Sequence, residues 1–516
     1  MSEARRFPRA CVASPHHLAS SAGLAVLASG GNALDAAVAA NLTLGVVTPY
    51  LCGFGGDLFA MIWKDGEVFA YNGSGRAPAA ATPESVRAAA GADRMPAFGP
   101  ATVTIPGAVE AWFVLLERFG SRPFGDLAQT ALRYAADGFV PSALAMASLR
   151  RSAARYAWSK EWMAVYGDLE EGRPLRQPDL ARTIGLLSTD GANAFYRGPI
   201  GEAIVEHLRA QEGQMSTEDL SEHRGEFARP LGATYRGVDV LELPPNTQGV
   251  TALEGLNIVT ALDGLPPDGA ERQHMLIEAM KLALADRDAN VTDPDFMPVS
   301  PEVLLSKGWA EERAKAIDAS RAGRPHAGGA SSGGTAYVCA ADADGMLVSL
   351  IQSNWTGFGS GVTVPGWGIN LQNRGALFSL DPGHVNVIAP RKRTMHTLIP
   401  AMALREGRPW LVFGTMGGHG QAQTHLQLLV RIIDDRMDLQ RAIDAPRWCV
   451  SPADSSVSAE PRFAAPVLEG LRDLGHALEA VEPFDSLMGH AHAIDVAEHG
   501  YLGATDPRTE GAVLGM

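Results

Sequence analysis

Three observations predict an α+β fold for this chain. Helical patterns with charged outer faces dominate residues 107–318. Two hairpin patterns, over residues 58–71 and 336–352, each join apolar runs through a turn that contains an Asp-Gly step. The 516 residues are 46% hydrophobic with a mean hydropathy of -0.02, which is typical of a globular protein. We therefore expect helices and strands in a globular protein.

The composition excludes several classes of protein. With 43 basic against 58 acidic residues, the net charge of -15 disfavours binding to nucleic acid. The four cysteines form no CxxC pair, so neither a disulfide framework nor a zinc site is indicated. The longest apolar stretch, residues 33–47, contains Asp35 and Asn41 and is too short to span a bilayer. No signal-peptide pattern opens the chain, so we expect a soluble cytoplasmic protein without a membrane partner.

Two helices are expected near the N-terminus. Small residues over 18–29 form a helical pattern that ends at Gly30-Gly31, and Asn32 can cap a second helix over residues 33–44. Residues 53–57 (GFGGD) are then typical of a tight loop. This loop lacks the strand–loop–helix context of a dinucleotide site, so we expect no cofactor.

The composition changes abruptly before Thr335. Residues 319–334 are rich in Gly, Ala and Ser, and we expect this segment to be mobile. Directly after it, residues 336–341 and 346–352 are apolar runs on either side of a turn. A flexible leader therefore runs into a strand whose first residue is a threonine.

A threonine at this place has a specific chemical use. Its hydroxyl is a weak nucleophile near neutral pH and needs a base. The α-amine of an N-terminal threonine, with a pKa of about 8, can be that base once the chain is cut before it. Gly334 suits such a cut because glycine adopts strained conformations at little cost. The alternative interpretation of Thr335 is a plain hydroxyl at the start of a strand that follows a linker.

Motifs along nearly the whole chain resemble the γ-glutamyltranspeptidase family of N-terminal-nucleophile hydrolases. They lie at residues 13–20, 30–38, 53–57, 104–108, 348–353, 357–361, 365–368, 414–418, 444–447 and 506–508. The resemblance implies a four-layer αββα sandwich built by two chains from one precursor. Residues 1–334 would form the large chain and residues 335–516 the small chain, which begins with the nucleophile. We expect these chains to associate as an αβ heterodimer, or as a dimer of heterodimers.

The resemblance also implies the catalytic groups. The family's nucleophile corresponds to Thr335, and the second hydroxyl that the family places near the nucleophile's amine corresponds to Ser353. The backbone N–H groups of the family's oxyanion hole correspond to Gly417 and Gly418. Without the resemblance, this Gly-Gly pair would be interpreted as a tight turn after the strand over residues 410–413.

The substrate pocket departs from the family pattern. The family's carboxylate-binding arginine is matched by Ser74, with Arg76 two residues away, and its amine-binding aspartate is matched by Leu377. An asparagine is replaced by Trp355, a glutamine by Arg374, and a Ser-Ser pair by His396 and Thr397. A buried ammonium without a carboxylate partner costs several kcal/mol, so we do not expect a glutamyl substrate. The changes resemble the amidohydrolase and acylase branch, which includes oxamate amidohydrolase and cephalosporin-type acylases.

Several side chains keep two interpretations. Arg374, with His396 or Arg76, can hold a carboxylate on the acyl side of a small amide, or it can belong to a structural ion pair. His419 can line the pocket or cap the helix that follows it. His490 and His492 alternate on an expected strand, but no third ligand lies near them in sequence, so we expect no metal site. His16 and His17 precede a helix and are interpreted as structural.

The leading hypothesis is an autoprocessed amidohydrolase that acts on a small acid amide, for example an oxamate-like compound, through an acyl-enzyme on Thr335. The first alternative is a γ-glutamyltransferase or glutathione hydrolase with an unusual pocket. The second alternative, from another class, is a catalytically inactive relative that acts as a binding protein.

Overall fold

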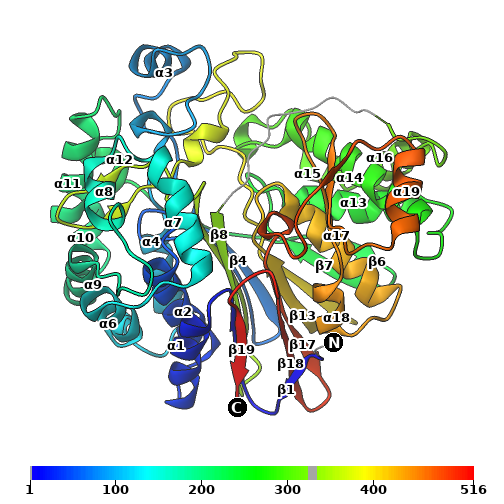
Figure 1. Cartoon of the computed structure of the whole chain (residues 1–516), viewed down its shortest axis with the longest axis horizontal. Coiled ribbons are helices and arrows are strands. Elements are labelled where there is room, and N and C mark those ends of the chain that lie inside the picture. The colour runs from blue at the N-terminus through cyan, green and yellow to red at the C-terminus, as the bar shows by residue number, and fades with distance from the viewer. Residues whose placement is uncertain (1–2, 324–333) are drawn as a thin grey trace.

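The computed structural model describes residues 3–323 and 334–516, and two stacked β-sheets form its centre (Figure 1). The first sheet has seven antiparallel strands. In sheet order these are β1 (Arg5–Phe7), β18 (Gly500–Thr505), β17 (Ala491–Ala497), β13 (Arg408–Thr415), β12 (Ala401–Arg405), β7 (Val238–Glu242) and β6 (Leu231–Tyr235).

The second sheet also has seven antiparallel strands. In sheet order these are β19 (Ala512–Gly515), β2 (Cys11–Ser14), β8 (Gly334–Ala341), β9 (Leu347–Trp355), β3 (Asp57–Lys64), β4 (Glu67–Asn72) and β5 (Glu226–Ala228). Smaller sheets are formed by β10 (Thr363–Val364) with β11 (Ile369–Asn370), and by β14 (Trp448–Val450), β15 (Val457–Ala459) and β16 (Leu478–Ala480).

Helices cover the outer face of each sheet, which gives four layers (Figure 1). On the side of the second sheet lie α1 (His17–Ala28), α2 (Ala33–Val47), α3 (Pro83–Ala90), α4 (Ala108–Phe119), α5 (Phe124–Leu127), α6 (Gln129–Asp137), α7 (Ala143–Arg155), α8 (Lys160–Tyr166), α9 (Pro178–Asp190), α10 (Asn193–Tyr196), α11 (Pro199–Arg209) and α12 (Thr217–Ser221). On the side of the first sheet lie α13 (Gly249–Ala261), α14 (Ala270–Asn290), α15 (Pro301–Leu304), α16 (Lys307–Lys315), α17 (Gly420–Ile433), α18 (Leu439–Asp444) and α19 (Ala465–Asp473). Short 3-10 turns are η1 (Pro100–Thr102), η2 (Pro294–Phe296), η3 (Arg374–Leu377) and η4 (Ser486–Met488).

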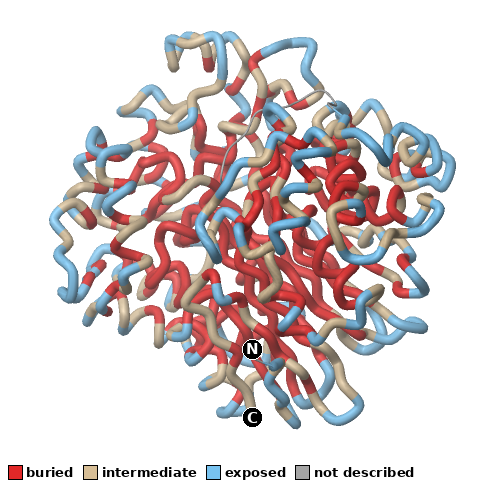
Figure 2. Tube along the Cα trace, turned by 45° about the vertical axis from the view of Figure 1, so that its right-hand side comes forward, coloured by how far each residue is buried: buried red, intermediate tan, exposed pale blue. Residues whose placement is uncertain are grey.

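Burial is concentrated in the two sheets and in the inner faces of the helices (Figure 2). A cluster of apolar side chains lies between the sheets, in which Phe59 and Ile351 from one sheet face Val412 and Ile494 from the other. Both faces of β8 and β9 are therefore buried, which explains why neither strand alternates between apolar and exposed polar residues. Within residues 3–323 and 334–516, no helix combines the length and apolar character needed to cross a bilayer.

The predicted N-terminal elements are confirmed. Helix α2 begins at a capping box in which Asn32 and Asp35 satisfy each other's backbone N–H groups. Strands β3 and β4 form the first predicted hairpin, and β8 and β9 form the second. Of the segment expected to be mobile, residues 324–333 lie outside the described part of the chain, and Gly334 already belongs to β8.

The prediction that helices dominate residues 107–318 misses three strands. Strands β5, β6 and β7 lie between α12 and α13, and β6 pairs with β7 through a turn at Arg236-Gly237. Both turn residues have positive φ, 51° and 81°, as a tight hairpin turn requires. The strands are short and lie at or next to sheet edges, so half-exposed polar residues interrupt the apolar pattern.

Each of the two sheets contains strands from both sides of position 335. Strand β8 lies between β2, from the N-terminal part, and β9, which follows it in sequence. A cut before Thr335 would therefore leave two chains that share both sheets, as the predicted division into residues 1–334 and 335–516 requires.

Two motifs near the C-terminus meet in a buried ion network. Asp506 contacts Arg447 at 2.7 Å and Arg508 at 3.1 Å, and Arg508 also contacts Glu460 at 2.5 Å. Burial alone would raise the pKa of Asp506, but the two guanidinium groups hold it well below its usual range. The network connects the loop after α18 to the strands β17 and β18.

We expect Asp506→Asn to lower the free energy of unfolding by about 3–5 kcal/mol, because it leaves two buried guanidinium groups short of a negative charge. The depressed pKa means that this stabilisation is present above about pH 4 and is lost as the pH falls further. Denaturant unfolding of both proteins between pH 7 and pH 3 measures it. If the difference in unfolding free energy between the two proteins stays constant from pH 7 to pH 3, the depressed pKa of Asp506 does not stabilise the fold.

Candidate active site

Thr335 lies at the start of β8, in the middle of the second sheet. Its side chain is completely buried, and its Oγ1 has no hydrogen-bond partner within residues 3–323 and 334–516. The register of β8 against β9 shifts at this residue, because Gly334 pairs with Trp355 whereas Ala336 pairs with Gln352. Such bulges often lie next to active sites and re-aim a side chain. A buried hydroxyl without a partner is costly, and within the described residues those of Thr104 and Thr251 share this state, so it is the position of Thr335 beside the bulge that sets its hydroxyl apart.

Gly334 is held in a space that admits only glycine. A Cβ atom on this residue would lie 2.6 Å from the carbonyl oxygen of Tyr50 and 3.2 Å from the amide nitrogen of Gly357. The peptide bond that joins Gly334 to Thr335 is thus fixed from both sides by backbone atoms.

Ser353, on β9, contacts the carbonyl group of this peptide bond. Its Oγ accepts hydrogen bonds from the backbone N–H of Trp355 at 2.7 Å and from the guanidinium of Arg374 at 3.2 Å. The hydroxyl hydrogen is therefore left to donate to the carbonyl oxygen of Gly334, at 2.5 Å. Two donors into one hydroxyl strengthen the bond that it donates, so Ser353 polarises the Gly334 carbonyl.

Arg374 supplies the positive charge of the site. Its guanidinium donates to Ser353 and to the hydroxyl of Thr397, at 3.0 Å, and lies 4.5 Å from the centre of the Trp355 ring. Its Nε is buried without a partner, and no carboxylate in the described part of the chain forms an ion pair with it. Burial lowers the pKa of Arg374 to about 9, which still leaves it charged at neutral pH, and the nearby Asp57 opposes this shift. Within the described residues, Arg374 therefore does not form the structural ion pair that was considered for it.

His396 pairs with Asp57 beside Arg374. The Nδ1 of His396 accepts the backbone N–H of Leu398, so its Nε2 carries the hydrogen and donates to Asp57 at 3.2 Å. Burial, and then the charge of Arg374, lowers the pKa of His396 well below its usual value, so the ring is neutral. Burial raises the pKa of Asp57 to about 7, against the opposing charge of Arg374.

His419 and Trp355 form another wall of the site. Their rings meet edge to face, with centres 5.8 Å apart. His419 stands at the N-cap position of α17, but its side chain makes no cap hydrogen bond to the helix. Its Nδ1 accepts a hydrogen bond from Arg287 at 3.0 Å, which leaves the hydrogen on a buried Nε2 without a partner. Trp355 has a φ of 77°, a conformation that is rare for a bulky residue and is held here by its contacts.

Gly417 and Gly418 lie in the loop between β13 and α17. Their φ angles are 135° and 56°, in the region that favours glycine. Across residues 3–323 and 334–516, neither backbone N–H has a hydrogen-bond acceptor, whereas the Gly418 carbonyl accepts from the Gln248 side chain at 2.9 Å. Two fixed and unused N–H groups are what a tetrahedral oxyanion requires.

Gln248, which the sequence did not point to, connects this loop to the charged part of the site. Its amide nitrogen donates to the carbonyl oxygens of Gly418 and Thr397, both at 2.9 Å, and its oxygen accepts from Arg287 at 2.8 Å. It follows the Pro244-Pro245 pair and precedes α13, in a part of the chain where the sequence singled out no residue. Asp57 is the last residue of the motif at residues 53–57, but it was likewise not predicted as a site residue.

Ser74 and Arg76 make no hydrogen bonds to Ser353, Arg374 or Thr397. The Ser74 hydroxyl donates to Asn72 at 2.7 Å, and Arg76 forms an ion pair with Asp293 at 3.0 Å. The charge of Arg76 is therefore already compensated, so it is a poor candidate to share a substrate carboxylate with Arg374.

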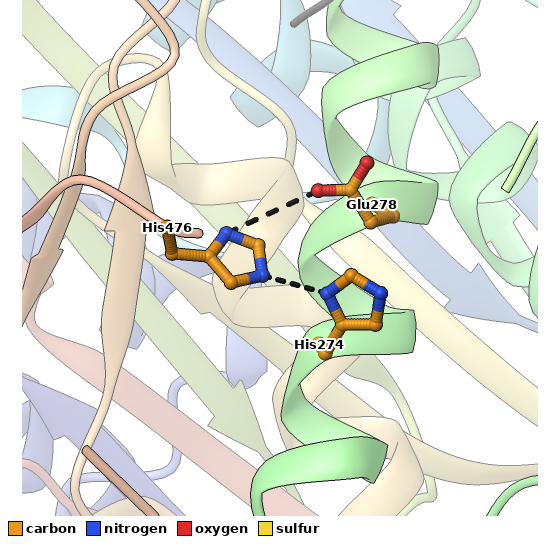
Figure 3. Close-up of side chains that lie close together, drawn as sticks. All are labelled: His274, Glu278 and His476. Atoms are coloured by element: carbon orange, nitrogen blue, oxygen red, sulfur yellow. Dashed lines mark hydrogen bonds and ion pairs between the residues drawn. The ribbon is translucent and has the colours of Figure 1, made fainter. Parts of the chain in front are cut away.

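One cluster within the described residues has the composition of a metal site, and it does not contain Thr335. Ligand atoms of His274, Glu278 and His476 lie within 4.8 Å of one another (Figure 3). The ammonium of Lys281 lies 2.8 Å from Glu278 and 3.4 Å from His476, so a positive group already occupies this place. His490 and His492 are not part of the cluster.

The same cluster holds the end of the segment that precedes residue 324. Glu278 accepts the backbone N–H of Gly323 at 2.9 Å, Lys281 donates to the Gly323 carbonyl at 3.0 Å, and His274 contacts the Asp318 carbonyl at 2.8 Å. His476 comes from beyond position 335, so the cluster connects the two predicted chains.

Two antiparallel sheets between helical layers, with a hydroxyl residue at the start of a central strand, define the architecture of an N-terminal-nucleophile hydrolase. Comparison with solved structures agrees. The chain superimposes on a cephalosporin acylase from Bacillus halodurans with a TM-score of 0.95 and 37% identity, covering 100% of this chain and 97% of that one.

Comparison with known sequences defines the family. The model of the gamma-glutamyltranspeptidase family matches residues 19–516. The glutathione hydrolase-like YwrD proenzyme of Bacillus subtilis is 39% identical over 98% of both chains. The oxamate amidohydrolase proenzyme of Klebsiella pneumoniae is 39% identical over 97% of both chains. The chain belongs to the gamma-glutamyltranspeptidase family. Both of these relatives are enzymes, and both are named as proenzymes.

We expect Gln248→Met to lower kcat about 10- to 100-fold, with a smaller change in KM, because the Gly417-Gly418 loop loses its support. Gln427→Met is the matched control. Its buried amide also bridges two carbonyl oxygens, those of Gln423 and Trp448 at 3.1 and 3.0 Å, but it does not reach the site. Steady-state kinetics of both variants decide, and equal loss of kcat in the two would contradict a positioning role for Gln248.

Proposed function

We propose that this protein is an autoprocessed amidohydrolase that cleaves the C–N bond of a small acid amide, such as oxamate, through an acyl-enzyme on Thr335. The observation that carries the proposal is the arrangement at the Gly334–Thr335 bond. An unpartnered hydroxyl lies next to a carbonyl that is polarised, at 2.5 Å, by the hydroxyl of Ser353.

Maturation follows from this arrangement. The Oγ of Thr335 attacks the Gly334 carbonyl carbon, and the Gly334–Thr335 C–N bond breaks to give an ester and a free α-amine. Water then cleaves the ester, leaving a carboxylate on Gly334 and a hydroxyl on Thr335. Ser353 and the Arg374 charge behind it stabilise the oxyanion of the first step. The two resulting chains stay associated because they share both sheets.

In the mature enzyme the new α-amine of Thr335 acts as the base. It takes the proton of the hydroxyl as Oγ attacks the substrate's amide carbon, and it returns that proton to the departing amine. The unused N–H groups of Gly417 and Gly418 stabilise the oxyanion, a role whose loss costs roughly 3–4 kcal/mol per donor. With the same amine as base, water then attacks the carbonyl carbon of the acyl-enzyme. The ester bond to Thr335 breaks, and the acid is released.

The charges of the site favour a substrate with a carboxylate on the acyl side. The buried Arg374 has an unpartnered Nε and no ion pair in the described chain, so a substrate carboxylate would supply the missing acceptor. His396, His419 and Thr397 lie around it as further polar groups. Arg374 lies one hydroxyl away from the carbonyl that is attacked, so the carboxylate and the amide of the substrate must be close together. An oxalyl group meets this condition, and one relative is named oxamate amidohydrolase.

A glutathione hydrolase is the second candidate, favoured by the name of the Bacillus subtilis relative. A γ-glutamyl group also carries an ammonium, which needs a carboxylate partner. Asp57 is the carboxylate beside Arg374, but its two oxygens accept from Gly75 at 3.1 Å and from His396 at 3.2 Å. Desolvation of the ammonium would therefore remain uncompensated.

We expect the purified protein to run as two chains, the smaller of which begins at Thr335. Thr335→Ala should stay a single inactive chain, and Ser353→Ala should be processed at least tenfold more slowly because the Gly334 carbonyl loses its donor. Gel electrophoresis with N-terminal sequencing measures both effects. Thr397→Val, which loses a hydroxyl bonded to Arg374 but not to Gly334, is the control for Ser353.

Two outcomes would overturn the maturation scheme. A mature N-terminus at another residue, such as Ser331 or Ser332, would remove Thr335 as nucleophile. A wild-type protein that stays one chain would favour the inactive binding relative.

We expect oxamate and other monoamides of small dicarboxylic acids to be hydrolysed, with kcat/KM for γ-glutamyl anilide and glutathione at least about a hundredfold lower. Measuring all substrates on one processed preparation tests this. If glutathione is preferred by a wide margin, the second candidate replaces the first.

A further inference from the structure

A cleft opens beside Gly334 and Gly417. Its volume is about 280 Å³, and its walls include Arg151, Arg155 and His490. Arg374, His396 and Thr397 do not line it, and all three are completely buried. The backbone of Gly334 therefore borders this cleft, while its carbonyl oxygen accepts a hydrogen bond from Ser353, which Arg374 contacts in the buried part of the site.

One helix face forms the outer wall of this cleft. Leu144, Ser148, Arg151 and Arg155 recur every three or four residues along α7 and so share one face, which lies over the start of β8 (Figure 1). Next to this face, the Tyr156 hydroxyl lies 3.1 Å from the carbonyl oxygens of both Thr356 and Gly359, which share its one hydrogen.

This contact ties the end of α7 to the loop that follows Ser353 and Trp355. Arg155 comes close to the same loop, since one of its nitrogens lies 3.9 Å from where a Cβ on Gly357 would be. Gly357 in turn adjoins Gly334, so Arg155 lies near the Gly334–Thr335 bond, with its guanidinium 5.1 Å from the centre of the Phe98 ring.

The two arginines of this face lack an ion-pair partner. Across residues 3–323 and 334–516 no carboxylate lies within 4.0 Å of either guanidinium, whereas their neighbour Arg150 pairs with Glu171 at 3.0 Å. Asp485 also lines the cleft; its carboxylate accepts the backbone N–H of Leu487 at 2.8 Å and keeps its charge, so one carboxylate shares the cleft with the two guanidinium groups. In a protein with a net charge of -15, two adjacent unpaired guanidinium groups make a local positive field at the mouth of the site.

We propose that Arg151 and Arg155 form a subsite for a carboxylate on the amine half of the substrate. This inference rests on the proposed function and adds to it the class of leaving group. The acyl half lies toward the buried Arg374, and the amine half must leave through the open side, where the two arginines stand. The substrates that fit are amides of amino acids or of other amines that carry an acid group. Guanidinium groups suit this role because they bind carboxylates through paired N–H donors.

The test compares two amides that share an acyl group, N-oxalylglycine and N-oxalylglycinamide, which differ only in the charge of the amine half. We expect the wild-type enzyme to prefer N-oxalylglycine, and the ratio of the two kcat/KM values to fall at least tenfold in the Arg151→Gln/Arg155→Gln double variant. The ratio should recover in Arg151→Lys/Arg155→Lys. Arg150→Gln, on the same helix but paired with Glu171, should keep the wild-type ratio. An unchanged ratio in the double glutamine variant, or an equal loss in Arg150→Gln, would overturn the proposal.

A binding measurement separates this proposal from the proposed function. N-acetylglycine and N-acetylglycinamide are titrated calorimetrically into the wild-type protein and the double glutamine variant, which requires no turnover. We expect the wild type to bind N-acetylglycine at least tenfold more tightly than the amide, and the variant to lose this preference. If the wild type hydrolyses neither oxalyl compound, the proposed function fails, and calorimetry alone decides the subsite. Equal binding of the two acetyl compounds by the wild type would overturn it.

Discussion

The hydrogen bond from the Ser353 hydroxyl to the Gly334 carbonyl is the interaction on which the rest of the site depends. Ser353 can donate in this direction only because a backbone N–H and the Arg374 guanidinium occupy its two acceptor positions. Gly334 can receive it only because no side chain separates its backbone from Tyr50 and Gly357. The bulge at Thr335 then places a hydroxyl without a partner beside a polarised carbonyl.

This arrangement requires both sheets. Thr335 and Ser353 belong to neighbouring strands of the second sheet, whereas Gly417 and Gly418 follow β13 of the first sheet. Gln248 spans the two groups, because it contacts the Gly418 loop on one side and the Thr397 backbone beside Arg374 on the other. Since residues on both sides of position 335 build each sheet, cleavage would free the Thr335 amine without separating the groups that use it.

The sequence predicted those features that depend on local pattern. Capping residues and Asp-Gly turns located α2 and both hairpins, and the resemblance selected Ser353 and Arg374, which lie in contact beside the Gly334–Thr335 bond. Strands β6 and β7 were missed because half-exposed edge strands lack an unbroken apolar run. Gln248 and Asp57 were missed because their roles arise from contacts with segments distant in sequence. Arg76 was assigned by proximity in sequence to Ser74, whereas its charge is compensated by Asp293.

The central claim is that Thr335 carries the acyl group during turnover. Acid quenching of the processed enzyme during hydrolysis of an oxalyl amide, followed by peptide mapping by mass spectrometry, measures this directly. The account predicts that the peptide that begins with Thr335 gains the mass of the oxalyl group, and that the adduct is lost once substrate is exhausted. An adduct on a different peptide, with the Thr335 peptide unmodified throughout turnover, would contradict it.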